Sequence, residues 1–280
     1  MANSHSINIK GNLFSLNKPL VMGILNVNND SFYKKSRFTA QESVLKHIDK
    51  MQQDGAAIID IGAASTRSGA KLVSASDEIE VLLPIIKLVM NEFPHLPFSI
   101  DTYNAQTANV MVHEGASLIN DISAGKYDPL MFKTIADLGI PYIMMHIQGI
   151  PETMQLAPTY QHVVKDTIEY FVERVGCARE AGIKDVIIDP GFGFGKTLEH
   201  NYSLLKSLSL FKVFDCPILC GLSRKSVINK VINTDAENAL NGTTVLNTIA
   251  LLNGANILRV HDVLEAKQAV ELFYYYSNVN

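Results

Sequence analysis

The sequence contains few cysteines, and no two of them have the spacing of a CxxC pair. Only three are present, Cys177, Cys216 and Cys220, an odd number without a CxxC pair. A disulfide framework or a cysteine-rich zinc site normally shows paired spacings. This scarcity argues against both of these protein classes and favours reduced thiols in a cytoplasmic protein.

Long hydrophobic runs are also absent. The most apolar stretch, residues 81–90, is interrupted by Pro84 and Lys87. It is much shorter than the roughly 20 residues that a membrane-spanning helix needs. The first residues lack the charged-then-apolar layout and the cleavage site of a signal peptide. We therefore expect no association with a membrane.

Positive charge is not in excess. The chain has 24 lysines and arginines against 28 aspartates and glutamates, a net charge of −4. Surfaces that bind nucleic acid are usually strongly basic, so we expect no nucleic-acid partner. Any anion that this protein binds must be held by a few local cations. Hydrophobic residues make up 47% of the chain, which is enough to fill a large core.

The sequence does contain a repeating pattern of short apolar runs. These runs are continuous rather than alternating, as expected of parallel strands that are covered on both faces. They occur at residues 20–27, 56–62, 97–102, 117–123, 141–146, 185–190, 217–223 and 256–262. Amphipathic stretches separate them, and glycines at 55, 115, 139 and 182 stand where helices should end.

Eight strand-then-helix units predict an α/β fold, a single (β/α)8 TIM barrel that forms one domain over residues 1–280. An open doubly wound sheet is the alternative, although such sheets rarely need so many parallel strands.

Polar or charged residues end each of these apolar runs. They are Asn26, Asp60, Asp101, Asn120 with Asp121, His146, Asp189, Ser223 with Arg224 and Lys225, and Arg259 with His261. In a barrel these ends converge on one face, where barrel enzymes build their active sites. The pattern predicts a site at the C-terminal ends of the strands, with Asp60 and His146 bracing their neighbours.

These residues divide into two chemical groups. Asp101, Asn120 and Asp189 are acceptors suited to the N–H-rich edge of a planar heterocycle, because carboxylates accept strong charge-assisted hydrogen bonds. The other group is positively charged and comprises Arg67, Arg224, Lys225, Arg259 and His261. Clustered cations of this kind are suited to a pyrophosphate group. The pattern predicts a pocket that binds a nitrogen heterocycle on one side and phosphates on the other.

The stretch VIIDPGFGFGKT, residues 186–197, resembles a phosphate-binding loop at first sight. A Walker loop requires a glycine five places before its Gly-Lys pair, and that place holds Pro190. Proline also removes a backbone N–H that a phosphate would need. The stretch therefore does not match a phosphate loop, and we expect Lys196 to be a solvated bystander beyond the strand.

Several longer motifs follow one another along the chain. They are MGILNV-NNDSF (22–32), IDIGAASTRSGA (59–70), SIDTYN (99–104), INDIS (119–123), MMHIQG (144–149), IIDPGFGFGK (187–196), GLSRKS (221–226) and RVHDV (259–263). In this order the motifs cover nearly the whole chain, and the sequence resembles the dihydropteroate synthases, the pterin-binding TIM-barrel family of folate biosynthesis.

The resemblance implies a transfer reaction with two small-molecule substrates. It implies that 6-hydroxymethyl-7,8-dihydropterin pyrophosphate and p-aminobenzoate condense to 7,8-dihydropteroate and pyrophosphate. The family's dissociative route, in which Mg²⁺-bound pyrophosphate leaves before the arylamine attacks, is implied as well. It requires no nucleophilic serine or cysteine, in agreement with the absence of a GxSxG motif.

The resemblance also implies roles for particular residues. Pterin binding falls to Asp101, Asn120, Asp189 and Lys225, and pyrophosphate binding to Thr66, Arg259 and His261. Asn26 matches the position that holds Mg²⁺, and Phe194, Ser223 and Arg67 match positions around p-aminobenzoate. Catalysis is implied for Lys225, Arg259, His261 and Asn26. Dimers are common in the family, and we expect a homodimer whose interface includes the last helix, around residues 263–276.

Two other functions remain open at this point. A pterin-dependent methyltransferase domain would share the barrel and part of the pterin site, but it would not need the STRSGA, SRKS and RVHD motifs. A catalytically silent pterin-binding paralogue is the second. It is open because the first loop departs from the family, with Asn28-Asn29 in place of Thr-Pro and Lys34-Lys35 where Asp-Gly would fall. The second loop has Ser68 where proline is usual.

Overall fold

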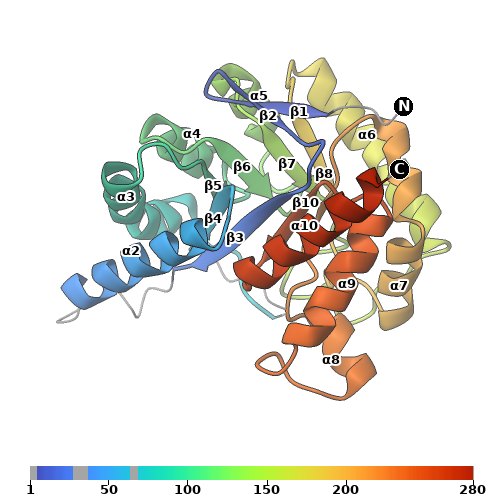
Figure 1. Cartoon of the computed structure of the whole chain (residues 1–280). Helices are drawn as coiled ribbons and strands as arrows, with labels where there is room; N and C mark the ends of the chain where they lie inside the picture. Colours follow the sequence, from blue (N-terminus) through green and yellow to red (C-terminus); the bar gives the residue numbers. More distant parts are fainter. Residues whose placement is uncertain (1–4, 28–36, 64–68, 280) are drawn as a thin grey trace.

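The computed structural model of the chain describes residues 5–27, 37–63 and 69–279. Within them eight parallel strands form a barrel: β3 (Leu20–Asn26), β4 (Ile58–Gly62), β5 (Phe98–Asp101), β6 (Leu118–Asp121), β7 (Tyr142–Met145), β8 (Val186–Asp189), β9 (Leu219–Cys220) and β10 (Ile257–Val260). The hydrogen-bonded order is β8-β7-β6-β5-β4-β3-β10-β9, and a parallel bridge between Ile188 and Ile218 brings the two ends together. The predicted TIM barrel is confirmed, and every predicted apolar run contains one of these strands (Figure 1).

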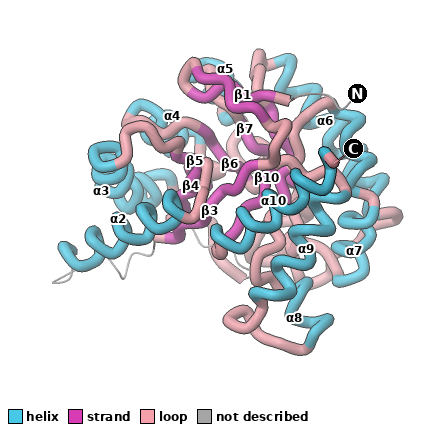
Figure 2. Tube along the Cα trace, in the orientation of Figure 1, coloured by secondary structure: helices cyan, strands magenta, loops and turns pink. Residues whose placement is uncertain are grey.

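Helices surround the strands on the outside (Figure 2). They are α2 (Arg37–Gln53), α3 (Ala75–Glu92), α4 (Ala105–His113), α5 (Met131–Leu138), α6 (Val163–Glu180), α7 (Leu198–Lys206), α8 (Ser226–Ile232), α9 (Leu240–Leu252) and α10 (Val263–Asn278), with a 3₁₀ helix η1 at Leu208–Phe214. The predicted glycine ends are confirmed, because Gly55, Gly115, Gly139 and Gly182 follow α2, α4, α5 and α6 with positive φ angles. No helix in the described ranges is both long and apolar enough to cross a membrane.

A β-hairpin precedes the barrel, and it was not predicted. Strands β1 (Ser6–Ile9) and β2 (Asn12–Ser15) pair antiparallel, joined through Lys10 and Gly11 at φ angles of 50° and 83°. Positive φ at both turn positions is typical of the two-residue turns that match the twist of paired strands.

The hairpin covers the N-terminal end of the barrel. Its Ile7 and Ile9, together with Leu16, pack against inward-facing residues of the barrel strands. These are Met22, Ile58, Leu118, Ile143, Ile187, Leu219 and Ile257. Since most of them stand at or near the first residue of their strands, the hairpin closes the end that lies opposite to the polar residues. The C-terminal ends of the strands remain for the site.

Candidate active site

Two carboxylates, one amide and one arginine form a hydrogen-bonded network at the C-terminal ends of the strands. Arg259, in β10, donates from Nε to Asp60 Oδ2 at 2.6 Å and from Nη2 to Asp101 Oδ2 at 2.8 Å. Asn120, at the end of β6, donates from Nδ2 to the same Asp60 oxygen at 3.0 Å. The predicted convergence of these residues, up to 199 positions apart, is confirmed. Asp60 supports its neighbours, as the sequence indicated, because it accepts hydrogen bonds from both Asn120 and Arg259.

Burial alters the acid–base behaviour of the two pterin-matching carboxyl groups. Asp101 is 7% exposed, and desolvation raises its pKa to about 7, against the attraction of Arg259 and with added repulsion from Asp60. Desolvation also raises the pKa of Asp189, and Lys225 is the main opposing charge. Both groups are thus kept from water, and ligand N–H groups could restore the hydrogen bonds that water would provide.

Lys225 lies beside the loop that follows β8. Its Nζ donates to the carbonyl of Phe192 at 2.7 Å and lies 4.6 Å from the centre of the Phe194 ring. Burial lowers the pKa of Lys225 to about 8, while the charge of Asp189 acts in the opposite direction. The structure therefore brings together Lys225, Phe194 and Asp189, which the sequence assigned to adjoining parts of one pocket.

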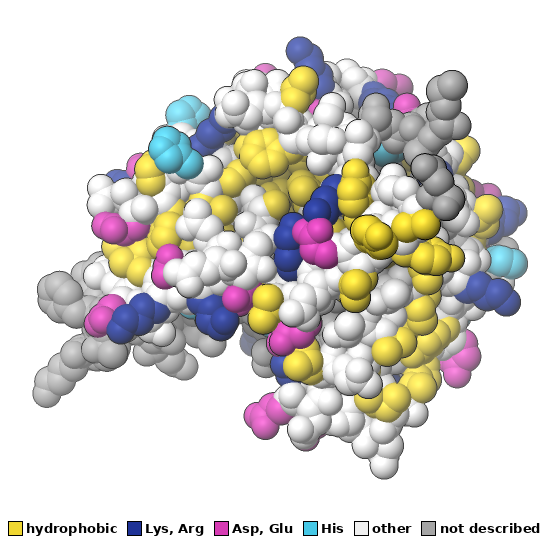
Figure 3. All heavy atoms as spheres, in the orientation of Figure 1, with side chains coloured by type: hydrophobic (Ala, Val, Ile, Leu, Met, Phe, Trp, Pro, Cys, Tyr) yellow, Lys and Arg dark blue, Asp and Glu magenta, His cyan; other side chains and the backbone are white. Residues whose placement is uncertain are grey.

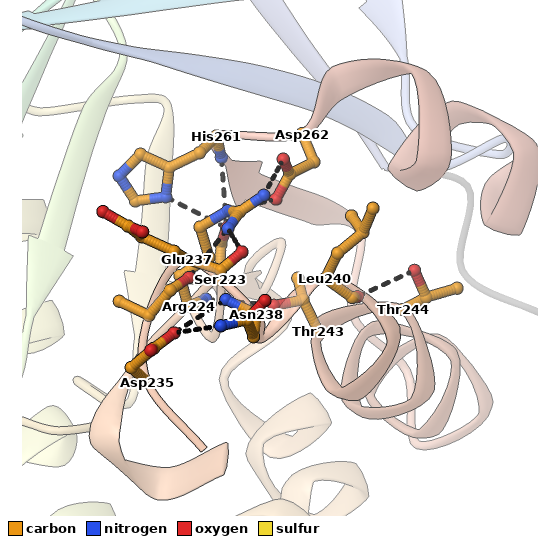
Figure 4. A network of polar contacts seen from close by, with 11 residues as sticks. Ser223, Arg224, Asp235, Glu237, Asn238, Leu240, Thr243, Thr244, His261 and Asp262 are labelled. Atoms are coloured by element: carbon orange, nitrogen blue, oxygen red, sulfur yellow. Dashed lines mark hydrogen bonds and ion pairs between the residues drawn. The ribbon is translucent and has the colours of Figure 1, made fainter. Parts of the chain in front are cut away.

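Ser223 and His261 form a second pair at the same end of the barrel, shown with its neighbours in Figure 4. Ser223 Oγ lies 3.0 Å from His261 Nδ1, and the backbone N–H of His261 donates to the same hydroxyl at 3.2 Å. Ser223 is buried, whereas His261 is exposed and can reach a ligand in solution. The hydroxyl thereby fixes the ring of the histidine at the edge of the pocket.

Arg224 has a different place from the one expected. Its guanidinium donates to both oxygens of Asp262 at 2.8 and 2.7 Å, and its Nη1 donates to the carbonyls of Ala236 and Glu237 (Figure 4). The prediction that Arg224 offers its charge to phosphates is wrong, because a bidentate carboxylate already neutralises it. The residue instead ties the start of α8 to the start of α10 and to the segment before α9.

The loop after β8 is organised by its carbonyl groups. Each carbonyl from Gly191 to Gly195 accepts a hydrogen bond from a side chain, and the donors are Lys196, Lys225, Gln155, Lys196 again and Tyr160. The backbone N–H groups of Gly191 and Gly193 donate to Asp189 and Asn201. The carbonyls of this loop accept from side-chain donors, and the N–H groups of Gly191 and Gly193 already donate within the protein. A loop of this kind is unsuited to phosphate, which needs free N–H donors. The rejection of a phosphate loop is therefore supported.

Two glycines allow this loop to touch the end of β7. A Cβ on Gly191 would lie 2.0 Å from the carbonyl oxygen of His146, and one on Gly195 would lie 2.7 Å from that of Gln148. Both glycines also have positive φ, at 72° and 58°. The glycines serve backbone-to-backbone packing between two loops rather than access to an anion.

Lys196 is buried, and the prediction that it is solvated is wrong. Its side chain is 3% exposed, and its ammonium donates to carbonyls of both loops. His146, whose carbonyl is one of these acceptors, is itself buried with its ring 4.7 Å from that of Tyr170. Desolvation holds the pKa of His146 well below its usual value, so the imidazole is neutral and structural, as the sequence suggested.

A buried carboxyl group that sequence reasoning missed supports the strand-end site. Glu78, in α3, accepts from Thr102 Oγ1 at 2.6 Å and from Asn104 Nδ2 at 2.9 Å, directly after Asp101. Asp121 is equally buried and accepts from Ser123, Gly125 and Tyr142. The only sequence signal for Glu78 was a carboxylate four positions before the apolar helical stripe that begins at Leu82, a placement that many exposed glutamates share.

The remaining predicted positions concern the metal and the first two loops. Asn26 ends β3 with an exposed side chain. The described part of the chain contains no cluster of three or more His, Cys, Asp or Glu residues that could hold a metal alone. Thr66 and Arg67 lie outside the described residues, as do Asn28, Asn29, Asp30, Lys34, Lys35 and Ser68.

Comparisons with known proteins agree with this geometry. A family profile described as "Pterin binding enzyme" matches residues 22–261. The dihydropteroate synthase of Escherichia coli (strain K12) is 39% identical over 265 residues, covering 94% of this chain and 93% of that protein.

Solved structures are similar over the whole chain. A Yersinia pestis dihydropteroate synthase with a sulfonamide drug has a TM-score of 0.91 and 36% identity, with 98% of this chain and 100% of that one covered. A Xanthomonas albilineans dihydropteroate synthase in complex with 7,8-dihydropteroate has a TM-score of 0.85 and 31% identity, with 98% and 99% covered.

Proposed function

The chain belongs to the pterin-binding dihydropteroate synthases, and from that premise we propose how its strand-end residues carry out the reaction. The protein is a transferase of folate biosynthesis and a sulfonamide target. It condenses 6-hydroxymethyl-7,8-dihydropterin pyrophosphate with p-aminobenzoate to give 7,8-dihydropteroate and pyrophosphate. The observation that carries the residue assignment is the network in which Arg259 donates to Asp60 and Asp101 while Asn120 donates to the same oxygen of Asp60.

The pterin ring binds among Asp101, Asn120, Asp189 and Lys225. Asn120 donates its amide N–H to Asp60, so its amide oxygen is left as an acceptor. Asp101 and Asp189 are desolvated carboxyl groups whose hydrogen-bond capacity suits ring and exocyclic N–H groups. The ammonium of Lys225 supplies the donor for a ring carbonyl or nitrogen. Acceptors and one donor at the C-terminal ends of the strands match the edge of a pterin.

Departure of pyrophosphate is the first chemical step. The C–O bond breaks with its electron pair remaining on the pyrophosphate oxygen, and the pterin ring delocalises the positive charge of its methylene group. Arg259 and His261, with Thr66, bind the departing anion. Hydrogen-bond donors stabilise such a leaving group when they are oriented before the charge develops.

A metal ion fits the charge of this site. The cations Arg259 and Lys225 already interact with the carboxylates of Asp60, Asp101 and Asp189, so the described residues carry no surplus positive charge for a pyrophosphate. Mg²⁺ accepts few protein ligands and keeps several waters, so the side-chain oxygen of Asn26 with phosphate oxygens is a suitable set. When bound, Mg²⁺ would supply the positive charge that the leaving group needs.

Attack of the amine completes the transfer. The nitrogen of p-aminobenzoate forms a C–N bond to the pterin methylene and then releases a proton to solvent. Phe194 presents an aromatic ring for the incoming amine, and Arg67 and Ser223 bind its carboxylate side. The distance of 4.6 Å between Lys225 Nζ and the Phe194 ring centre supports pterin and amine subsites that adjoin each other.

Steady-state release of pyrophosphate tests the proposal. The purified protein, with Mg²⁺, the pterin pyrophosphate and p-aminobenzoate, is expected to release one pyrophosphate for each dihydropteroate formed. Pterin binding without turnover would instead favour a silent paralogue. Transfer of a methyl group would favour the methyltransferase alternative.

We also infer that residues 1–280 act as one pterin-binding domain in a cytoplasmic homodimer. The free cysteines Cys177, Cys216 and Cys220 favour a reducing compartment. Exposed hydrophobic side chains gather over α9 and α10 (Figure 3). A groove of about 950 Å³ between these helices is lined by Leu240, Leu252, Leu272, Phe273 and Tyr276 among others. This face is where a second copy of the chain would pack.

A further inference from the structure

Lys196 is buried without a carboxylate partner in the described parts of the chain. Its side chain is 3% exposed, and its Nζ donates to the carbonyls of His146 at 3.2 Å, Gly191 at 2.9 Å and Phe194 at 3.0 Å. Lysine is rarely buried to this extent unless its donors are satisfied. An ammonium has three donors, and three carbonyl oxygens surround this one. The three donors of the lysine are therefore matched by backbone carbonyls, while the charge of Asp189 acts on it from farther away.

The three acceptors come from two separate segments. His146 directly follows β7, whereas Gly191 and Phe194 lie in the loop after β8. One ammonium thus joins the end of β7 to this loop across 50 positions of sequence. The backbones of the two segments pack closely at Gly191, because a methyl group at this position would collide with the carbonyl of His146.

The loop after β8, which Lys196 holds, links Asp189 to Phe194, two residues assigned to the proposed substrate pocket. Phe194 donates its N–H to Gly191, and both carbonyls of this turn are held by Lys196. The N–H of Gly191 in turn donates to Asp189 at 2.8 Å. The Phe194 ring, which lies beside Lys225, is attached to the backbone that Lys196 holds.

We propose that Lys196 is a positioning residue for p-aminobenzoate: its three carbonyl hydrogen bonds fix the turn that presents the Phe194 ring to the arylamine. This inference rests on the proposed function, since it assumes that Phe194 lines the amine subsite. The lysine touches neither substrate. It acts through the backbone of Phe194, while the pterin-binding groups Asp101 and Asn120 are held independently by Arg259 and Asp60.

A series of variants that differ in donor number tests this role. Lys196→Gln keeps two N–H donors, and Lys196→Met fills similar space with none. We expect the KM for p-aminobenzoate to rise in the order Lys, Gln, Met, by about tenfold or more for Met, because each unsatisfied buried carbonyl weakens the turn. The dissociation constant of the pterin pyrophosphate, measured by calorimetry, should change by less than about threefold, since Asp101 and Asn120 are held away from the turn by Arg259 and Asp60, and only Asp189 and Lys225 of its ligands adjoin it.

Lys184→Met is the matched control, because Lys184 is exposed just before the other end of β8. It should leave both constants at their wild-type values. A space-filling role would make the Gln and Met variants equal, and a general loss of folding would weaken both substrates together. Either result, or an unchanged KM for p-aminobenzoate, would overturn the proposal.

Two further outcomes distinguish this role of Lys196 from a folding defect and from a failure of the proposed function. If Lys196→Met does not fold, Lys196→Gln alone must raise the KM for p-aminobenzoate while pterin affinity is retained. If the wild-type protein releases no pyrophosphate at all, it is the proposed function that fails. An active wild type with indifferent Lys196 variants leaves the function intact and removes only this inference.

Discussion

At the residue scale, the ionisable groups of the site balance one another before any substrate binds. Asp60 and Asp101 are bonded to the guanidinium of Arg259, and Asp189 lies in the field of Lys225. Burial raises the pKa of Asp101 and of Asp189, and so opposes the charged form of both carboxyl groups. The pocket is therefore polar but nearly neutral, and a neutral heterocycle can replace water without a large electrostatic cost.

The carboxyl group of Asp189 provides the sharpest single-residue prediction. Asp189→Asn should weaken binding of the pterin substrate by about 1.5–3 kcal/mol, the usual contribution of a hydrogen bond to a charged group. Isothermal titration calorimetry at a pH near 8 measures this difference. Asp137→Asn, an exposed position on α5, is the control. Unchanged affinity in Asp189→Asn would mean that the carboxylate only holds Gly191.

The lysine beside Phe194 predicts a limit on activity at high pH. Burial lowers the pKa of Lys225 to about 8, so the ammonium is charged below that pH and is lost as the pH rises through it. We expect kcat/KM, which reports on the free enzyme, to fall above pH 8. In Lys225→Arg this fall should disappear, because a guanidinium stays charged, even though the absolute rate is lower. An identical high-pH fall in the variant would assign it to another group.

At the element scale, the hairpin contributes stability without contributing to the site. Ile7 in β1 is 1% exposed against the strand residues at the N-terminal end of the barrel. Ile7→Ala should lower the free energy of unfolding by about 2–5 kcal/mol, the cost of a cavity in a packed core. Urea denaturation measures this loss. Leu13→Ala in β2 should have little effect, because Leu13 is 74% exposed.

Measurements of activity distinguish the stabilising role of the hairpin from a catalytic one. Both hairpin variants should keep wild-type kcat and KM at temperatures where they are folded, since the hairpin covers the end of the barrel away from the polar residues. A catalytic defect in folded Ile7→Ala would show that the two ends of the barrel are coupled.

The strands were predictable from sequence, whereas several contacts between loops were not. Continuous apolar runs identify each barrel strand, and the polar residue that ends each run identified Asp101, Asn120 and Arg259 as neighbours. The hairpin has short strands whose burial depends on the finished barrel, so its local pattern carries little signal. Lys196 is satisfied by carbonyls as far as 50 positions away, and no side-chain pattern marks a backbone acceptor. Arg224 likewise meets Asp262 only through the fold.

At the scale of the whole molecule, α9 and α10 share a face with several exposed hydrophobic side chains. Leu272, Tyr275 and Tyr276 are each at least 73% exposed on α10, next to the groove against α9. Contiguous apolar surface of this kind usually marks an interface. A two-fold dimer buries the same patch on both copies, so one substitution changes the interface twice.

Leu272→Glu should therefore convert a dimer into monomers. Each dimer would bury two unpaired carboxylates, and an uncompensated buried charge costs several kcal/mol. Sedimentation velocity should show the mass falling by half, while Leu130→Glu, whose wild-type side chain is 64% exposed before α5, should leave the mass unchanged. Because Arg259, Asp101, Asn120 and Asp189 all belong to one chain, the monomer should keep its affinity for the pterin. A wild type that sediments as a monomer would show that this apolar face has another partner.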